Sequence, residues 1–151
     1  SVCNDMNLGA RKPEPTTHPV EVGLRSEAAI LSELVRRGYH VLVPFGFNHR
    51  YDLVIDLDGE FVRAQCKTGR LRKGAIVFSP QSVRSNMVKV MTRDYVGDVD
   101  LLLVYCPETQ GLFAVPIADL PPGGGASLRV DPTRNKQSVG IRWAHDYELP
   151  G

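Results

Sequence analysis

The stretch from Tyr51 to Lys67, YDLVIDLDGEFVRAQCK, constrains the fold of this chain more than any other. Two runs rich in Val, Ile, Leu and Phe flank Asp58-Gly59. An Asp-Gly pair between such runs is the strongest short-range signal for a two-residue β-hairpin turn. The turn sets the register of the two strands, so Asp52 is expected directly opposite Gln65.

Because side chains alternate along a strand, the predicted hairpin has two distinct faces. The apolar face is expected to carry Leu53, Ile55, Leu57, Val62, Ala64 and Cys66. The other face is expected to carry Asp52, Val54, Asp56, Phe61, Arg63, Gln65 and Lys67. A carboxylate, an amide and an ammonium group therefore meet at the open end of the hairpin, away from the turn.

Residues 19–37 follow a helical pattern, with Pro19 suited to the first turn and Gly38 suited to end the helix. At about 100° per residue, the apolar side chains fall on one arc. This arc holds Val20, Leu24, Ala28, Ile30, Leu31, Leu34 and Val35. Glu27 lies inside the arc, where a carboxylate facing the core is costly unless something pairs with it. One candidate partner is a neighbouring arginine such as Arg63.

The remaining chain alternates short apolar runs with turns. Strands are expected at 39–44, 75–78, 100–106, 112–117, 128–130 and 140–143. A basic connection is expected at 68–74, a short helix around Ser82 to Val90, and a helical turn at 117–120. A helix followed by a run of strands predicts an α/β or α+β fold with a single sheet.

Composition limits the class of protein. Apolar content of 42% and charged content of 23% are ordinary for a soluble globular protein. No apolar run approaches the ~20 residues of a membrane span, and the first residues lack the apolar centre of a signal peptide. We therefore expect no membrane partner and a cytoplasmic location. Residues 1–18 are expected to form a flexible arm, which leaves 19–151 as one domain.

The three cysteines are odd in number and far apart in the sequence. Neither a disulfide framework nor a zinc-ligand spacing can be built from them. The net charge of +1 neither requires nor forbids a nucleic-acid partner. Any such partner must be argued from local clusters of charge.

Glu27, Asp52 and Gln65 together offer two carboxylates and an amide oxygen, which are ligands of the kind that Mg²⁺ takes. A lysine beside such a metal, here Lys67, can orient or deprotonate an attacking water and offset charge at a phosphate. Hydrolysis of a phosphodiester needs these groups. The alternative for the hairpin is an ordinary solvated polar face.

Basic residues gather after the hairpin, where they would suit a surface that follows a phosphate backbone. The cluster is Arg63, Lys67, Arg70, Arg72 and Lys73, with Arg84, Lys89 and Arg93 beyond it. The alternative is an ordinary solvated loop.

At these residues the chain resembles the PD-(D/E)xK nuclease superfamily, which is marked by an acid on one strand and (D/E)xK on the next. The run GLRSEAAILSELVRRGYHVLVPFGFNHRYDLVIDLDGEFVRAQCKTGR is similar to the branch of group I intron-encoded PD-(D/E)xK homing endonucleases. The later runs DYVGDVDLLLVYCPETQGLFAVPI and IRWAHDYEL also resemble it. The resemblance covers roughly residues 20–149.

This resemblance implies a restriction-endonuclease-like α-β-β-β-α-β core with a central mixed sheet, and DNA hydrolysis that depends on Mg²⁺, with Mn²⁺ as a substitute. By position, Asp52 matches the motif acid and principal metal ligand, and Glu27 matches the helix acid. Gln65 stands in the place of the second acid, and Lys67 is the motif lysine. The backbone carbonyl of Cys66 would be a further metal ligand.

Two positions depart from the pattern of the superfamily. Tyr51 replaces the proline before the motif acid, and Gln65 replaces the usual Asp or Glu, although the homing-endonuclease branch also uses QxK. The second departure lowers the charge of the site by one, which weakens metal affinity unless Glu27 compensates.

The expected function is therefore a metal-dependent endonuclease acting on double-stranded or branched DNA. Arg63, Arg70, Arg72, Lys73, Arg84 and Lys89 are the expected DNA-binding residues. Cutting both strands requires two active sites, which predicts a homodimer or homotetramer. The alternative is a non-catalytic nucleic-acid-binding or assembly domain that keeps the nuclease fold.

Overall fold

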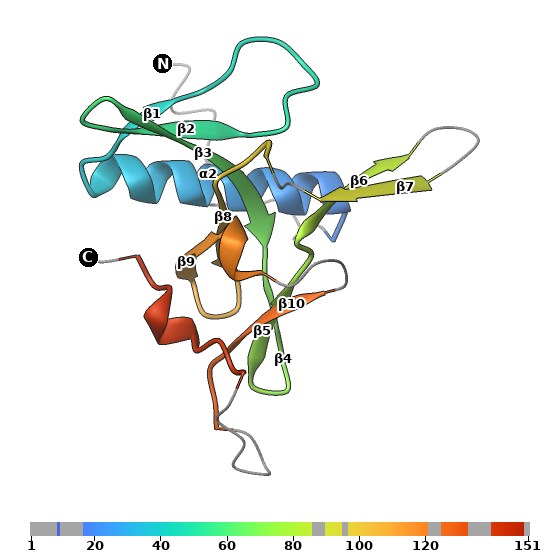
Figure 1. Cartoon of the computed structure of the whole chain (residues 1–151). Helices are drawn as coiled ribbons and strands as arrows, with labels where there is room; N and C mark the ends of the chain where they lie inside the picture. The colour runs from blue at the N-terminus through green and yellow to red at the C-terminus, as the bar shows by residue number, and fades with distance from the viewer. Residues whose placement is uncertain are drawn as a thin grey trace.

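The computed structural model describes residues 9, 17–85, 90–94, 97–120, 125–132 and 140–149, with only the backbone described at 82–85 and 90–94. The predicted arm at 1–18 therefore lies almost wholly outside the described residues. Figure 1 shows the chain as a helix and a set of strands arranged in layers. Within the described part of the chain, no helix is long and apolar enough to cross a membrane.

Helix α2 (Pro19–Arg36) lies against a five-stranded mixed sheet in the order β1-β2-β3-β8-β9. The strands of this sheet are β1 (His40–Leu42), β2 (Leu53–Leu57), β3 (Glu60–Thr68), β8 (Leu101–Cys106) and β9 (Gly111–Pro116). A three-stranded sheet holds β4 (Arg70–Arg72), β5 (Ala75–Phe78) and β10 (Ala126–Arg129), and a hairpin holds β6 (Gln81–Ser85) and β7 (Val90–Asp94). The 3-10 turns are η1 (Ile117–Asp119) and η2 (Ala144–Asp146).

The hairpin of β2 and β3 has the register expected from its turn. Leu57 pairs with Glu60, and Leu53 pairs with Ala64. Asp58 and Gly59 both have positive φ, 53° and 95°, as a type I′ turn requires. Because the turn holds the register, the polar residues at the open end of the hairpin keep the face that the sequence predicted for them.

The connection between β3 and β8 differs from expectation. These two strands pair in parallel, and β4 to β7 lie between them in the chain. The helix expected around Ser82 to Val90 is wrong, because this segment holds β6 and the start of β7, which pair in an antiparallel hairpin. The expected basic loop at 68–74 is also largely a strand: β4 turns through Lys73 and Gly74, both with positive φ, into β5.

Two apolar clusters cover the two faces of the five-stranded sheet. Between α2 and the sheet, the buried cluster holds Ile30, Leu34, Leu53, Ile55, Ala64, Leu103, Leu112 and Leu149. On the other face, against the three-stranded sheet and η2, it holds Ile76, Phe78, Val99, Leu102, Val104, Cys106, Phe113, Val115, Ala126, Leu128 and Ala144. With both faces covered, β8 is almost continuously apolar, as expected of a central strand.

The helix turns a narrower face to the sheet than its apolar arc predicted. Its buried residues are Ser26, Ile30 and Leu34, spaced four apart. Val20, Leu24 and Val35, which the arc assigned to the core, are 73%, 65% and 58% exposed. The sheet covers only one side of the helix, so one flank of the predicted arc faces away from it. Glu27, also on the arc, is only half-buried.

This narrower face gives a matched pair of substitutions. Leu34→Ala removes a fully buried side chain and should lower the free energy of unfolding by about 2–5 kcal/mol. Val35→Ala, one residue further along on the exposed flank, should change it by no more than about 0.5 kcal/mol. Urea unfolding followed by circular dichroism measures both. Equal losses in the two variants would contradict the observed orientation of α2.

Candidate active site

Asp52 lies where the β2–β3 ladder ends. Its backbone N–H donates to the carbonyl of Ala64 at 2.9 Å. Its side chain accepts a hydrogen bond from the backbone N–H of Cys66, with 2.8 Å between that nitrogen and Oδ2. Amides along β3 alternate between β2 and β8, and the amide of Cys66 points toward β2. The β2–β3 ladder ends before Cys66, so the Asp52 carboxylate, rather than a backbone carbonyl of β2, accepts the hydrogen bond of the Cys66 amide.

The structure brings Glu27 close to Asp52. Burial raises the pKa of the Glu27 carboxyl, and the negative charge of Asp52 raises it further. Burial also raises the pKa of Asp52, against the smaller opposing effects of the Cys66 hydrogen bond and of Lys67. Two carboxyl groups whose surroundings disfavour ionisation are placed together, one from the helix and one from the hairpin.

Lys67 lies on β3 beyond this pair. Its Nζ donates to the backbone carbonyl of Gln81 at 2.9 Å, which ties β3 to the start of β6. Burial lowers the pKa of the Lys67 ammonium group, Asp52 partly opposes this, and Arg50 lowers it further. Gln65 lies two residues earlier on the same strand and is half-buried, so strand alternation puts it on the same face as Lys67.

Cys66 lies between these two residues and faces α2. It packs beside the helix-side cluster, and burial raises the pKa of its thiol well above the usual range, with Asp52 and Glu27 adding to the effect. The side chain is therefore a packed thiol rather than a thiolate ligand. The carbonyl of Cys66, like its amide, belongs to the side of β3 that borders Asp52.

These residues fit a hard divalent cation. Nowhere in the described ranges do three or more His, Cys, Asp or Glu side chains form a group able to hold a metal ion. A metal here would therefore rely on the two carboxylates of Glu27 and Asp52, with amide, carbonyl and water oxygens completing its shell. Burial raises the pKa of both carboxyl groups, and the charge of Asp52 raises that of Glu27 further, so a cation between them would offset the cost of their ionisation.

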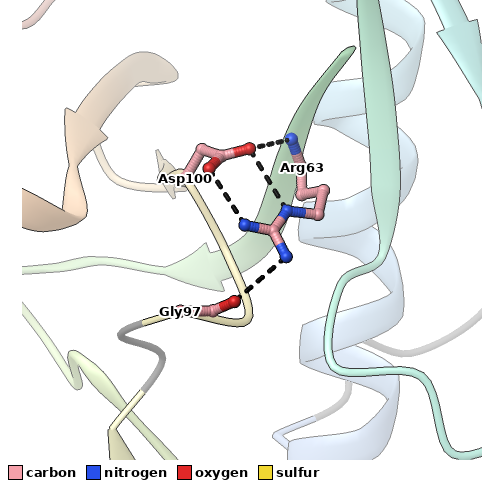
Figure 2. Close-up of polar contacts among 3 residues, drawn as sticks. All are labelled: Arg63, Gly97 and Asp100. Atoms are coloured by element: carbon pink, nitrogen blue, oxygen red, sulfur yellow. Dashed lines mark hydrogen bonds and ion pairs between the residues drawn. The ribbon is translucent and has the colours of Figure 1, made fainter.

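Arg63 does not take the place suggested for it beside Glu27. Figure 2 shows its guanidinium bound to Asp100, with 3.1 Å between Nη2 and Oδ1 and 3.3 Å between Nε and Oδ2. Nη1 donates to the carbonyl of Gly97 at 3.1 Å, and the Arg63 amide donates to Asp100 Oδ2 at 2.8 Å. Arg63 thus joins the edge of β3 to the loop that leads into β8.

Three of the other predicted basic residues lie on the β4–β5 hairpin. Arg70 and Arg72 lie near Glu108, at 3.7 and 3.9 Å from its Oε1, and Lys73 is exposed in the β4–β5 turn. The side chain of Arg84 and all of Lys89 lie outside what the structure describes.

Two contacts at the site were not predicted from the sequence. Arg50 pairs with Asp98 at 3.0 Å, which anchors the segment just before Asp52 to the loop before β8. The carbonyl of Gln81 holds Lys67. Neither has a local signal, because each partner lies at least 14 residues away in the chain.

The comparisons with known proteins identify the family of the chain. A family model described as PD-(D/E)XK endonuclease matches residues 17–150. The chain belongs to this family. The description of the family is that of an endonuclease, so the chain is a nuclease-family protein. The restriction-endonuclease-like α/β fold expected from the resemblance is confirmed.

Among solved structures, the PD-(D/E)XK fold of this chain is similar to that of a bacterial homing endonuclease, I-Ssp6803I. The TM-score is 0.67 at 22% sequence identity, over 87% of this chain and 88% of that chain. At this identity the likeness supports the fold alone. A search of curated proteins gives no match.

The raised pKa of Asp52 predicts how this site affects stability. Since the native protein binds the Asp52 proton more tightly than the unfolded chain does, ionising this carboxyl costs stability. The cost is absent below the ordinary aspartate pKa of about 4, grows as pH rises through the raised pKa, and persists above it. Asp52→Asn removes the charge and keeps an oxygen that can accept from Cys66. In EDTA at neutral pH the variant should therefore be more stable than the unsubstituted protein.

Chemical unfolding in EDTA across about pH 4 to 8 measures this difference, which should shrink toward the acid end. Asp146→Asn, at an exposed carboxylate in η2, is the matched control and should show little change. An Asp52→Asn protein less stable than the unsubstituted one at neutral pH would contradict the assignment.

Proposed function

We propose that this protein is a metal-dependent DNA endonuclease that hydrolyses phosphodiester bonds. The observation that carries the proposal is the pairing of two carboxylates with raised pKa, Glu27 and Asp52, one of them hydrogen-bonded to the amide of Cys66. Lys67, whose pKa is lowered by burial, stands on the next strand. Membership of the endonuclease family supports the reaction class.

Each residue of the site has a distinct role in this proposal. Asp52 and Glu27, with Gln65 and the carbonyl of Cys66, would hold Mg²⁺ or, in its place, Mn²⁺. When bound, such an ion supplies Lewis-acid stabilisation of the phosphate and lowers the pKa of a water. Lys67, oriented by the carbonyl of Gln81, would position the attacking water or help remove its proton.

DNA would approach with its backbone against positive charge. Arg70, Arg72 and Lys73 are exposed or half-exposed along the β4–β5 hairpin, and Arg84 and Lys89 extend the positive stretch in sequence. Of the expected DNA-binding residues, Arg63 would contribute least to phosphate binding, because its guanidinium already donates to Asp100 and to the carbonyl of Gly97. The described cysteines, Cys66 and Cys106, are free thiols, which suits a protein of the cytoplasm.

A second candidate is a non-catalytic DNA-binding domain that keeps the nuclease fold. The observation in its favour is Gln65, which leaves the site with two carboxylates rather than three. The two candidates differ in metal binding, so calorimetry with Mn²⁺ on the unsubstituted protein and on Asp52→Ala separates them. The nuclease requires binding that Asp52→Ala abolishes, whereas salt-dependent DNA binding without metal binding would favour the second candidate.

Catalysis itself is tested by removing the lysine. Lys67→Ala should lower the rate of cleavage of plasmid or branched DNA in Mg²⁺ or Mn²⁺ by roughly 100- to 10,000-fold, because it deletes the group that positions the water. Arg36→Ala, an exposed cation at the end of α2, should leave the rate unchanged. Single-turnover assays on gels measure both.

Two results would reject the catalytic role. One is the absence of cleavage by the unsubstituted protein on every substrate and metal. The other is a rate that Lys67→Ala leaves as it was.

Cutting both strands would also require a second copy of the site. We propose a homodimer or homotetramer, and the exposed apolar residues Val20, Leu24 and Val35 on one flank of α2 offer a surface for it. Light scattering at micromolar concentration should give at least twice the chain mass. A strict monomer that nevertheless cuts both strands together would contradict this part of the proposal.

A further inference from the structure

The loop between β1 and β2, residues 43–52, presents two aromatic rings to solvent. Phe45 is 100% exposed and Phe47 is 93% exposed. Figure 1 shows this loop standing clear of the sheet that its two strands belong to. Two almost wholly exposed aromatic rings on one short loop leave more apolar area uncovered than a single exposed side chain does, which favours a site of interaction.

The loop holds its shape through contacts of its own. The Nε2 of His49 donates to the carbonyl of Phe45 at 2.8 Å, which closes the chain around Phe47. Gly46 and Asn48 have positive φ, 97° and 63°, and each turns the backbone sharply beside Phe47. The rings are therefore carried on a closed turn.

The end of the loop is anchored as well. Arg50 pairs with Asp98 at 3.0 Å, and both side chains are largely buried. The ring of His49 lies 5.8 Å from that of Tyr51, centroid to centroid. A turn closed by its own hydrogen bond and anchored at its end by an ion pair can present an aromatic side chain at a defined place, which lowers the entropic cost of binding.

The position of the loop relates the rings to the candidate active site. Phe47 precedes Asp52 by five residues, and a chain rises at most about 3.6 Å per residue, so their Cα atoms lie within about 18 Å. That distance corresponds to about five base pairs of a duplex, at about 3.4 Å each. DNA with a phosphate at Asp52 and Glu27 would thus pass within reach of the two rings.

The lack of acidic residues before Asp52 favours nucleic acid over a second copy of the chain as the partner. Residues 43–51 contain neither aspartate nor glutamate, and their one arginine, Arg50, is paired with Asp98, so no acidic residue of this segment repels a phosphate backbone. Phe45 and Phe47 are almost wholly exposed, which suits insertion at a base step. The exposed apolar flank of α2, at Val20 and Leu24, suits contact between copies better.

We propose that Phe45 and Phe47 bind DNA by packing against its bases, one or both rings entering a base step near the cleaved phosphate. Apolar side chains used in this way unstack the step and bend the duplex, and stacked aromatic rings tolerate many sequences. The contact would favour flexible pyrimidine–purine steps, which open at the lowest cost. This inference rests on the proposed DNA endonuclease function and adds a substrate-positioning element to it.

Fluorescence anisotropy with labelled 30-base-pair duplexes, with Ca²⁺ in place of Mg²⁺, tests the proposal. The double variant Phe45→Ala/Phe47→Ala should bind about 10-fold more weakly or worse, while keeping its thermal midpoint because the rings are exposed. The matched control is Phe61→Ala, which removes another exposed ring, 61% exposed, from β3 near the turn of the β2–β3 hairpin. It should bind DNA as the unsubstituted protein does.

A second readout reports base unstacking directly. Duplexes carrying 2-aminopurine at successive positions should brighten when the unsubstituted protein binds, and the double alanine variant should lose this signal. Phe45→Trp/Phe47→Trp should keep it, since a larger ring can stack in the same way.

The outcomes separate this inference from the function on which it rests. Equal DNA affinity of the unsubstituted protein and the double alanine variant would overturn the loop contact and leave the endonuclease proposal in place. A double alanine variant with a smaller mass in light scattering would assign the rings to contact between copies and overturn it too. No DNA binding by the unsubstituted protein would overturn both proposals.

Discussion

The register of the β2–β3 hairpin is the constraint on which the rest of the candidate site depends. Side chains alternate with a period of two, so a slip of one residue would turn Leu53 and Ala64 to the polar face and Lys67 toward the core. Both ends of the hairpin resist such a slip. At one end Asp58 and Gly59 adopt the positive φ of the turn, and at the other the Asp52 carboxylate binds the Cys66 amide. Asp52, Gln65 and Lys67 can therefore share the polar face of the hairpin while Leu53 and Ala64 pack in the core.

That polar end is electrostatically unfavourable in the isolated protein. Burial raises the pKa of Glu27 and Asp52 and lowers that of Lys67, so each group is held in surroundings that disfavour its charged form. Such groups gather at functional sites because the same surroundings strengthen their interaction with a cation or a phosphate. Burial in the two apolar clusters offsets the free-energy cost of this polar end. The contact of Arg63 with Asp100 also joins β3 to the residue before β8 (Figure 2).

Sequence patterns predicted most strands and α2 closely, because alternation and turn residues act over short distances. These patterns gave wrong predictions where the structure depends on contacts between residues that lie far apart in the sequence. Where a helix was expected around Ser82 to Val90, strand Gln81–Ser85 pairs with strand Val90–Asp94 in an antiparallel hairpin. Val20 and Leu24 look like core residues in the helical pattern, yet the sheet covers only the side of α2 that carries Ile30 and Leu34.

By itself, the sequence determined the hairpin register, the polar set of Asp52, Gln65 and Lys67 on one face, and the acid within the first helix. These features depend on the local geometry of the backbone, and residues that are close in the sequence determine that geometry. Only the tertiary structure decided that Glu27 interacts with Asp52, that Arg63 binds Asp100, and that Phe45 and Phe47 are exposed to solvent. Each of these depends on how α2, β8 and the β1–β2 loop pack together, and that packing results from long-range burial and pairing.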